Sequence, residues 1–275
     1  DAAGSTFDAP YQEKLELEDA YLGWRSGSLF PRLGENALEL SFGKQKYQIG
    51  NGFFMWDGAS DEGKRGAYWI GPRKAFYMTG IARLQTGPYK LEGFYLKPND
   101  EAYTSTDVVG SNFEYTAGET GVLGVSYLKI IDSHRESRDG MDYFDGRIDL
   151  TPFASDRGFH LGAELALELN GNSQDSTAWY TEAGYDFDEL TWKPFLSYRF
   201  AWFGGDDEGS DDLEIWDPLW YGFNDWSTWY VGEKHGGLPN NGRVIAAAVD
   251  LLRTGTTRRL PQTTSLTRLG ARRSL

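Results

Sequence analysis

Cysteine is absent from this 275-residue sequence, and clusters of metal-binding residues are absent as well. The lack of cysteine excludes disulfides and thiolate metal sites. The three histidines, His134, His160 and His235, share no metal-ligand spacing. No glycine-rich phosphate loop or nucleophile motif occurs either. We therefore expect no enzyme activity, no metal site and no cofactor.

Long apolar runs are missing too, since no stretch approaches the roughly 20 apolar residues of a membrane helix. Hydrophobic residues make up 40% of the chain, and the mean hydropathy of −0.54 is typical of a water-soluble protein. A transmembrane β-barrel would pass unnoticed in this test, because its apolar residues stand only at every second position. Hydropathy thus excludes a helical membrane protein and leaves a barrel open.

The chain has an excess of acidic residues, with a formal net charge of −14. This charge argues against a nucleic-acid partner and against binding to an anionic membrane surface. From Arg253 onward there are six arginines and no acid, so all 41 acidic residues precede that point. Residues 253–275 also lack aromatic residues and alternation. We expect an irregular basic tail there, and one domain over residues 1–252.

What the sequence does contain is strict alternation of apolar and polar residues. In "GFHLGAELALELN" at 158–170, Leu161, Leu165 and Leu167 lie on one face of the predicted strand, and Glu164 and Glu168 on the other. The run is longer than the usual five or six residues of a strand, and about 9–11 residues cross a bilayer. We expect the leucines to face lipid and the glutamates to face water.

The same alternation recurs along the chain and predicts an all-β fold of about twelve or thirteen strands. Short and long connections alternate, as do the periplasmic turns and extracellular loops of outer-membrane barrels. Aromatic residues stand near strand ends, as in the girdles at membrane interfaces. We therefore expect an antiparallel up-and-down transmembrane β-barrel in the bacterial outer membrane. The expected strands are 13–25, 37–47, 50–56, 73–86, 88–97, 110–117, 121–131, 142–152, 158–170, 176–188, 190–203, 225–233 and 243–252.

Several segments resemble the alginate-export family of bacterial outer-membrane proteins. They are "LEDAYLGWRSG" at 17–27, "IGNGFFMWDGASDEGKRGAYWIGPRKAF" at 49–76, "LEGFYLKPND" at 91–100 and "DPLWYGFNDWSTWYVGE" at 217–233. The resemblance covers roughly residues 15–252, and it implies a monomeric barrel of about 18 strands. The chain departs from the family in lacking the remaining strands after residue 252 and in ending at Leu275 rather than at an aromatic residue. We therefore expect an incomplete version of that barrel.

The resemblance also implies a function, the export of an anionic, alginate-like polysaccharide by passive passage through a lumen that contains arginines. Outer-membrane lipid would surround the barrel, and periplasmic export components are candidate partners. Two alternatives to this function remain open. The first is a general or uptake porin for small sugars or organic acids, with the same barrel architecture. The second, of another class, is a soluble carbohydrate-binding β protein.

Basic residues are the candidates for the substrate pathway, because arginine binds carboxylates through a planar fork. The alternative for each is an ordinary cross-strand ion pair in the barrel wall. Asp19, Glu39, Asp149, Glu164, Glu168 and Glu182 share the predicted lumen faces, so we expect a mixed lumen with a local arginine constriction near Arg65, Arg73 and Arg83. The candidates, predicted from face parity or from the family-like segments, are Arg25, Arg65, Arg73, Lys74, Arg83, Lys129, Arg147, Lys193 and Arg199.

Two further patterns suggest sugar chemistry. Glu164 and Glu168 resemble the carboxylate pair of a glycosidase, but residues i and i+4 of one strand lie about 13 Å apart, beyond the separations that such enzymes use. We reject an active site there. The segment "IWDPLWYGFNDWSTWY" at 215–230 offers rings for stacking on sugars, and it equally suits an interface girdle with a packed loop.

Overall fold

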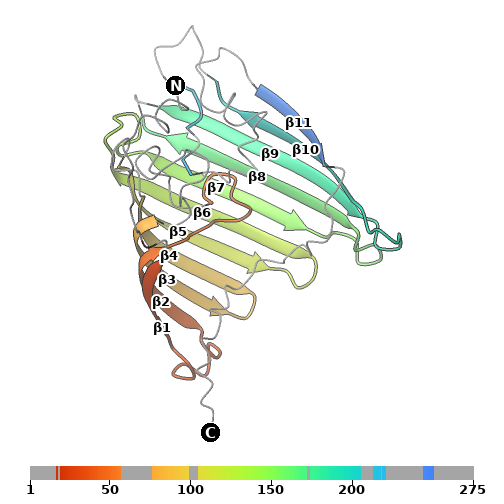
Figure 1. Ribbon diagram of the computed structural model, residues 1–275, viewed down its shortest axis with the longest axis horizontal. Helices are drawn as coiled ribbons and strands as arrows, with labels where there is room; N and C mark the ends of the chain where they lie inside the picture. The colour runs from red at the N-terminus through yellow and green to blue at the C-terminus, as the bar shows by residue number, and fades with distance from the viewer. Residues whose placement is uncertain are drawn as a thin grey trace, which may run out of the picture.

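The computed structural model describes residues 17, 19–56, 76–98, 105–171, 174–205, 213–217, 219–220 and 244–250, the last range by its backbone alone. These residues form one 11-stranded sheet in which the strands follow one another in chain order (Figure 1). Every pairing is antiparallel. The strands are β1 (Ala20–Arg25), β2 (Leu38–Gln45), β3 (Phe76–Thr86), β4 (Tyr89–Lys97), β5 (Asp107–Thr116), β6 (Gly121–Asp132), β7 (Asp142–Leu150), β8 (Phe159–Leu169), β9 (Asp175–Asp186), β10 (Phe195–Phe203) and β11 (Val244–Asp250).

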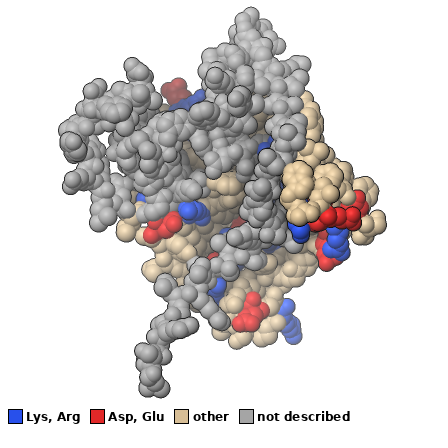
Figure 2. All heavy atoms as spheres, turned by 45° about the vertical axis from the view of Figure 1, so that its right-hand side comes forward, with Lys and Arg blue, Asp and Glu red and all other residues tan. Residues whose placement is uncertain are grey.

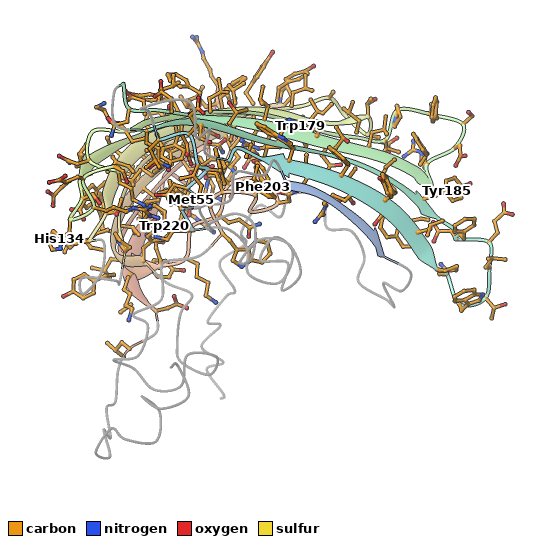
Figure 3. The ribbon with its side chains drawn as sticks, turned by 90° about the horizontal axis from the view of Figure 1, so that it is seen from above. Met55, His134, Trp179, Tyr185, Phe203 and Trp220 are labelled. Carbon is orange, nitrogen blue, oxygen red and sulfur yellow. The ribbon has the colours of Figure 1, made fainter. Side chains whose placement is uncertain are left out.

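The prediction of an all-β, up-and-down antiparallel fold is confirmed, and each of the 11 strands overlaps a predicted one. No helix in the described part of the chain is long and apolar enough to cross a membrane. Seen from above, the sheet is strongly curved, with one convex and one concave face (Figure 3). Among the described strands, β1 pairs with β2 alone and β11 with β10 alone, so these strands form an open arc. The predicted strand 225–233 and the predicted tail 253–275 lie outside the described residues.

Large apolar side chains are exposed on the convex face. Trp179 lies on that face, and its cross-strand neighbour Leu165 has 46% of its surface exposed (Figure 3). On β8, the strand of Leu165, the side chains of Glu164 and Glu168 point to the concave face and are buried. The predicted orientation of β8 is thus confirmed: its leucines point outward and its glutamates inward. On the side drawn in Figure 2, charged groups of both signs form small mixed clusters with uncharged surface between them.

Two chain segments fold onto the concave face, and one of them was predicted as a strand. Residues 50–56 are not a strand: they form turns and bends joined to residue 220 by the single parallel bridge Met55↔Trp220. Gly50 and Gly52 take φ values of +54° and +85°, which break an extended chain. Phe53, Phe54 and Met55 are consecutive and all buried, whereas a strand of the sheet would expose every second side chain on the convex face.

These segments, residues 46–56 and the described residues of 213–220 (213–217 and 219–220), create an apolar core inside the curve of the sheet. Phe53 packs against Phe203 and Trp216 at ring-centroid distances of 5.8 and 6.2 Å. The sheet contributes four fully buried residues of its own concave face, near the ends of strands that lead into or out of the connections 98–106 and 133–141: Leu96, Val108, Leu128 and Ile130. Met141, in the second of these connections, is fully buried as well. Where β4, β5 and β6 meet these connections, the concave face is therefore largely apolar.

Connection lengths follow the predicted alternation in part. The two longest connections, 46–75 and 204–243, leave the same end of the sheet, and both buried segments belong to them. The connection 170–174 at that end is shorter than the turns 151–158 and 187–194 at the opposite end, contrary to the prediction. The end that carries the two longest connections is called the long-loop end below.

Candidate functional site

One row of directly opposed residues crosses seven neighbouring strands on the concave face. Because side chains of opposed residues point to the same side of a sheet, the row forms a continuous polar band. From β1 to β7 its members are Arg25, Glu39, Arg83, Glu92, Asn112, Ser126 and Asp145.

Arginine and glutamate alternate in the first four positions of this polar row. Arg25 Nε lies 3.0 Å from Glu39 Oε2, and Arg83 bridges Glu39 Oε1 at 3.4 Å and Glu92 Oε1 at 2.6 Å. Asn112 continues the row by donating from Nδ2 to Glu92 Oε2 over 2.7 Å. Each arginine of the row is therefore held by at least one carboxylate of a neighbouring strand.

Arg147 of β7 connects several polar residues of the site through four hydrogen bonds. Its Nη1 donates to Ser126 Oγ at 2.8 Å and to Asp145 Oδ2 at 2.5 Å. Its Nη2 donates to Glu114 Oε1 at 2.8 Å and also to Asn112 Oδ1. The buried guanidinium thus joins residues of β5, β6 and β7, and charge-assisted bonds of this kind are the strong ones in proteins.

Two glycines leave the space that the Arg147 side chain occupies. A Cβ on Gly124 of β6 would lie 2.6 Å from Arg147 Cζ, and one on Gly50 would lie 2.8 Å from Arg147 Cδ. Gly50 belongs to the segment 46–56, so the arginine is enclosed between the sheet and this segment. Its neighbour Asn51 donates from Nδ2 to Tyr180 Oη over 2.6 Å and fixes the segment to β9.

Replacing Gly124 with alanine is expected to displace Arg147 and to destabilise the fold by about 1–3 kcal/mol, the usual cost of overpacking. Urea unfolding followed by tryptophan fluorescence would measure the change. Gly93→Ala and Gly146→Ala are matched controls, since a Cβ at either strand position meets no atom within 4 Å. Equal unfolding midpoints for all three variants would contradict a tightly enclosed guanidinium.

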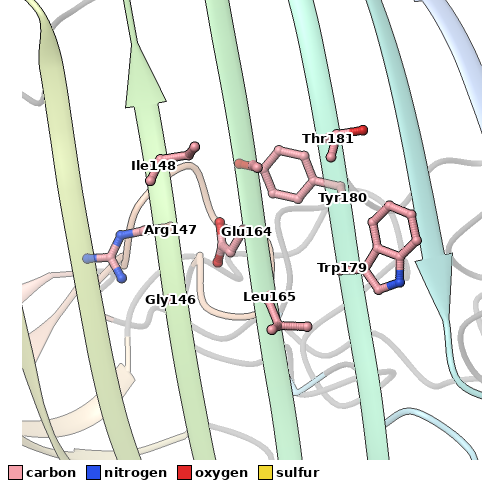
Figure 4. A pocket seen from close by; sticks show the side chains of 9 residues that line it. Gly146, Arg147, Ile148, Glu164, Leu165, Trp179, Tyr180 and Thr181 are labelled. Carbon is pink, nitrogen blue, oxygen red and sulfur yellow. The ribbon is translucent and has the colours of Figure 1, made fainter.

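Glu164 lies next to Arg147, and Arg147, Glu164 and Tyr180 are directly opposed on β7, β8 and β9 (Figure 4). The Glu164 carboxyl is buried, and neither of its oxygens has a hydrogen-bond partner among the described residues. The shallow pocket drawn in Figure 4, about 380 Å³, is also lined by residues of the opposite face, including Ile148 and Leu165. The sheet is thus a single layer of strands here, with charged side chains on its concave face and apolar side chains on its convex face.

The segment 213–220 is fixed to the sheet through Asp217. Arg138, from the connection 133–141, donates from Nε to Asp217 Oδ2 at 2.7 Å and from Nη2 to Oδ1 at 2.5 Å. Arg135 Nη1 lies 3.1 Å from Oδ2. The Asp217 backbone N–H donates to both oxygens of Glu168, at 3.2 and 3.0 Å, and Tyr143 Oη donates to the Asp217 carbonyl oxygen over 3.4 Å.

The electrostatic balance at Asp217 favours its ionised form. Burial raises the pKa of Asp217, but the guanidinium groups of Arg138 and Arg135 lower it by more, so the pKa lies below its ordinary value. A lowered folded-state pKa means that the contact is complete above the ordinary aspartate value of about 4 and is lost as the pH falls through the lowered value. Protonation would therefore loosen the attachment of the segment 213–220 only in acid.

Four of the predicted pathway residues do lie on the concave face: Arg25, Arg83, Arg147 and Arg199. Arg199 Nε donates to Glu182 Oε2 at 2.6 Å, and its guanidinium lies 5.7 Å from the centre of the Tyr180 ring. All four take part in ion pairs, which is the alternative role that the sequence left open for them. Arg65, Arg73 and Lys74 lie outside the described residues.

Two predicted pathway residues do not lie on the concave face. Lys129 points to the convex face, where its Nζ lies 3.0 Å from Asp142 Oδ2. The parity assignment was wrong because its neighbours Leu128 and Ile130 turn inward to the apolar core, a reversal of the pattern expected for β6. Lys193 lies in the turn before β10, exposed and 3.7 Å from Asp188, because β10 begins only at Phe195.

Sequence reasoning placed four glutamates correctly on the concave face, Glu39, Glu164, Glu168 and Glu182, but missed other charged groups of the site. Glu92 and Glu114 stand on strands that were predicted, and extending the same alternation through "YKLEGFYLK" and "NFEYT" would have placed both inward. The pair of Arg138 and Asp217 had no comparable signal, because it joins two loops 79 residues apart. In the described part of the chain, no group of three or more acidic or histidine side chains is arranged to hold a metal ion.

Comparison with known proteins adds no relative. No family model, no curated protein and no solved structure matches the chain.

Proposed function

We propose that this chain forms the wall of an outer-membrane channel that exports an anionic polysaccharide of the alginate type. The observation that carries the proposal is the inverted distribution of side chains over the curved sheet. Apolar residues such as Val125, Phe144 and Leu165 are exposed on the convex face, while charged residues such as Glu92 and Arg147 are buried on the concave face. A protein surrounded by water places these groups the other way round.

The convex face fits a lipid environment better than it fits water. Large contiguous apolar surfaces are rare on soluble monomers, and on a soluble protein they mark a binding or membrane surface. Here exposed apolar side chains occur on neighbouring strands in the middle of the sheet, including Phe113, Leu123, Val125, Phe144, Ile148 and Leu165. Strand lengths of 9 to 12 residues from β4 to β10 match a bilayer crossing.

The concave face supplies groups that suit a charged polymer. Arg25, Arg83 and Arg199 are ion-paired yet retain partly exposed side chains. A guanidinium that already binds a carboxylate can exchange it for the carboxylate of a passing uronate, because the geometry of both contacts is the same. Passage requires weak, repeated contacts of this kind, since one tight site would hold the polymer in place.

A general or uptake porin for small sugars or organic acids is the second candidate. One observation favours it: charges of opposite sign alternate along the polar row, so these residues give no net positive field that would select anions. A soluble carbohydrate-binding protein has less support, because the exposed rings and leucines of the convex face fit lipid better than water.

Recording from single channels in planar bilayers tests the proposal. With an export channel, reversal potentials should show anion preference, and oligo-uronates should block the current while neutral oligosaccharides of equal length do not. Arg199→Ala should weaken the block. Arg157→Ala is the matched control, because Arg157 is an exposed arginine that pairs with Glu119 outside the concave face. Equal block by neutral and acidic sugars would favour the porin, and absence of any channel would contradict both.

A further inference from the structure

Arg135 and Arg138 together hold one carboxylate at the long-loop end of the concave face. The Arg138 fork contacts both oxygens of Asp217, and Arg135 adds a third contact at 3.1 Å. Two parallel N–H···O bonds from one guanidinium are the arrangement by which arginine recognises carboxylates in general. The carboxylate that is bound here belongs to the chain itself.

The residues of this site belong to connections between strands, and its two arginines differ in exposure. Arg138 is buried, and its Nη1 also donates to Thr106 Oγ1 over 3.5 Å, which orients the guanidinium. The Arg135 side chain, by contrast, is 45% exposed. The half-exposed arginine provides an approach from solvent, and the buried one provides the fixed fork.

We propose that Arg135 and Arg138 form a binding site for the carboxylate of a uronic-acid unit, and that Asp217 occupies it as an internal mimic of that ligand. This inference rests on the proposed function, which supplies an acidic polysaccharide. A uronate that enters the site replaces Asp217 carboxylate for carboxylate, with no change in the charge bound. Asp217 then returns to water, and the segment 213–220 loses its ion pairs with the connection 133–141.

The packing of this segment determines what the exchange would do. Trp216 is buried against Phe53 and against Tyr143, with ring centroids 6.2 and 6.3 Å apart. Trp220 and Phe76 form a T-shaped pair with ring centroids 5.3 Å apart. Release of Asp217 therefore weakens the hold on an aromatic segment that fills the concave face at this end. A polymer has an advantage over a single sugar, because neighbouring units raise the effective concentration of its carboxylates.

Binding of an oligo-uronate to the full chain in detergent micelles, measured by calorimetry, tests the exchange. Asp217→Asn removes the internal competitor while keeping a side chain of equal size. We expect this variant to bind the oligo-uronate about tenfold more tightly than the wild type, since affinity rises with the fraction of competent sites. Adding Arg138→Gln to Asp217→Asn should abolish the gain, and adding Arg135→Gln should reduce it. Because Arg135 is half exposed, its variant still reports on the site if Arg138→Gln misfolds.

The controls separate this site from the channel itself. Glu119→Gln removes the carboxylate partner of exposed Arg157 outside the concave face and should leave the affinity unchanged. A gain that survives Arg138→Gln in a folded protein, or no gain in Asp217→Asn, would overturn the inference. Channel block by oligo-uronate that is equal in wild type and Asp217→Asn would leave the proposed function standing without this site. If Asp217→Asn binds the oligo-uronate more tightly but the protein forms no channel, the binding site would stand and the proposed channel function would fail.

Discussion

Replacing Arg147 with methionine is expected to lower the free energy of unfolding by about 3–5 kcal/mol, the cost of leaving buried charges without their partner. Arg147 faces Asp145, Glu114 and Glu164, and it donates four hydrogen bonds on the concave face. Methionine fills a similar volume, so the loss would come from the carboxylates and not from a cavity. Urea titration in detergent micelles gives the measurement.

Two further variants show whether charge is the cause. Arg25→Met removes a partly exposed arginine at the β1 end of the polar row and should cost under about 1 kcal/mol, as surface pairs do. Adding Asp145→Asn and Glu164→Gln to Arg147→Met should recover part of the loss, because fewer uncompensated charges remain buried. If Arg147→Met costs no more than Arg25→Met, Arg147 does not organise this site.

Replacing Leu165 with arginine should cost about 2–4 kcal/mol in the membrane-inserted protein, as charged groups do on the lipid face of a barrel near the bilayer midplane. Leu165 lies in the middle of β8 on the convex face. Leu190 is a matched control, because it has the same 46% exposure but lies in the turn between β9 and β10. In lipid, Leu190→Arg should cost under about 1 kcal/mol.

The same two substitutions distinguish a membrane wall from a soluble sheet. In water an exposed leucine can be replaced by arginine at little cost wherever it stands, since surface changes are usually within about 0.5 kcal/mol. Unfolding and refolding in lipid vesicles, followed by tryptophan fluorescence, compares the two variants. Equal, small effects at Leu165 and Leu190 would contradict a lipid-facing β8.

The sequence predicted the parts of the fold that depend on local alternation. Successive side chains of β8 point to opposite faces of the sheet, so the orientations of Leu165 and Glu164 follow from their positions in the alternating run. The segment 46–56 could not be assigned in this way, because Phe53, Phe54 and Met55 are buried on all sides by a chain that folds onto the sheet. Strand periodicity carries no information about a segment that returns over the concave face.

The candidate site was predictable to the same limited extent. Arg83 and Arg147 follow the parity of their strands, whereas Lys129 fails because the segments 46–56 and 213–220 make the concave face apolar where β6 ends. The bond from Arg138 to Asp217 joins residues 79 apart in two irregular connections. Contacts of this kind depend on tertiary packing, and a single sequence gives no periodic signal for them.

The environment of the convex face is the central claim, and site-directed labelling in lipid vesicles tests it most directly. The chain has no cysteine, so Leu165→Cys can carry a single environment-sensitive fluorophore. Gln85→Cys is the comparison site, because Gln85 is exposed and lies opposite Lys90, which binds Glu92 and Glu114 on the concave face. We predict that nitroxide-labelled lipids quench the fluorophore at residue 165 and that aqueous iodide quenches the one at residue 85. Quenching of residue 165 by iodide, with no effect of the nitroxide lipids, would contradict the account.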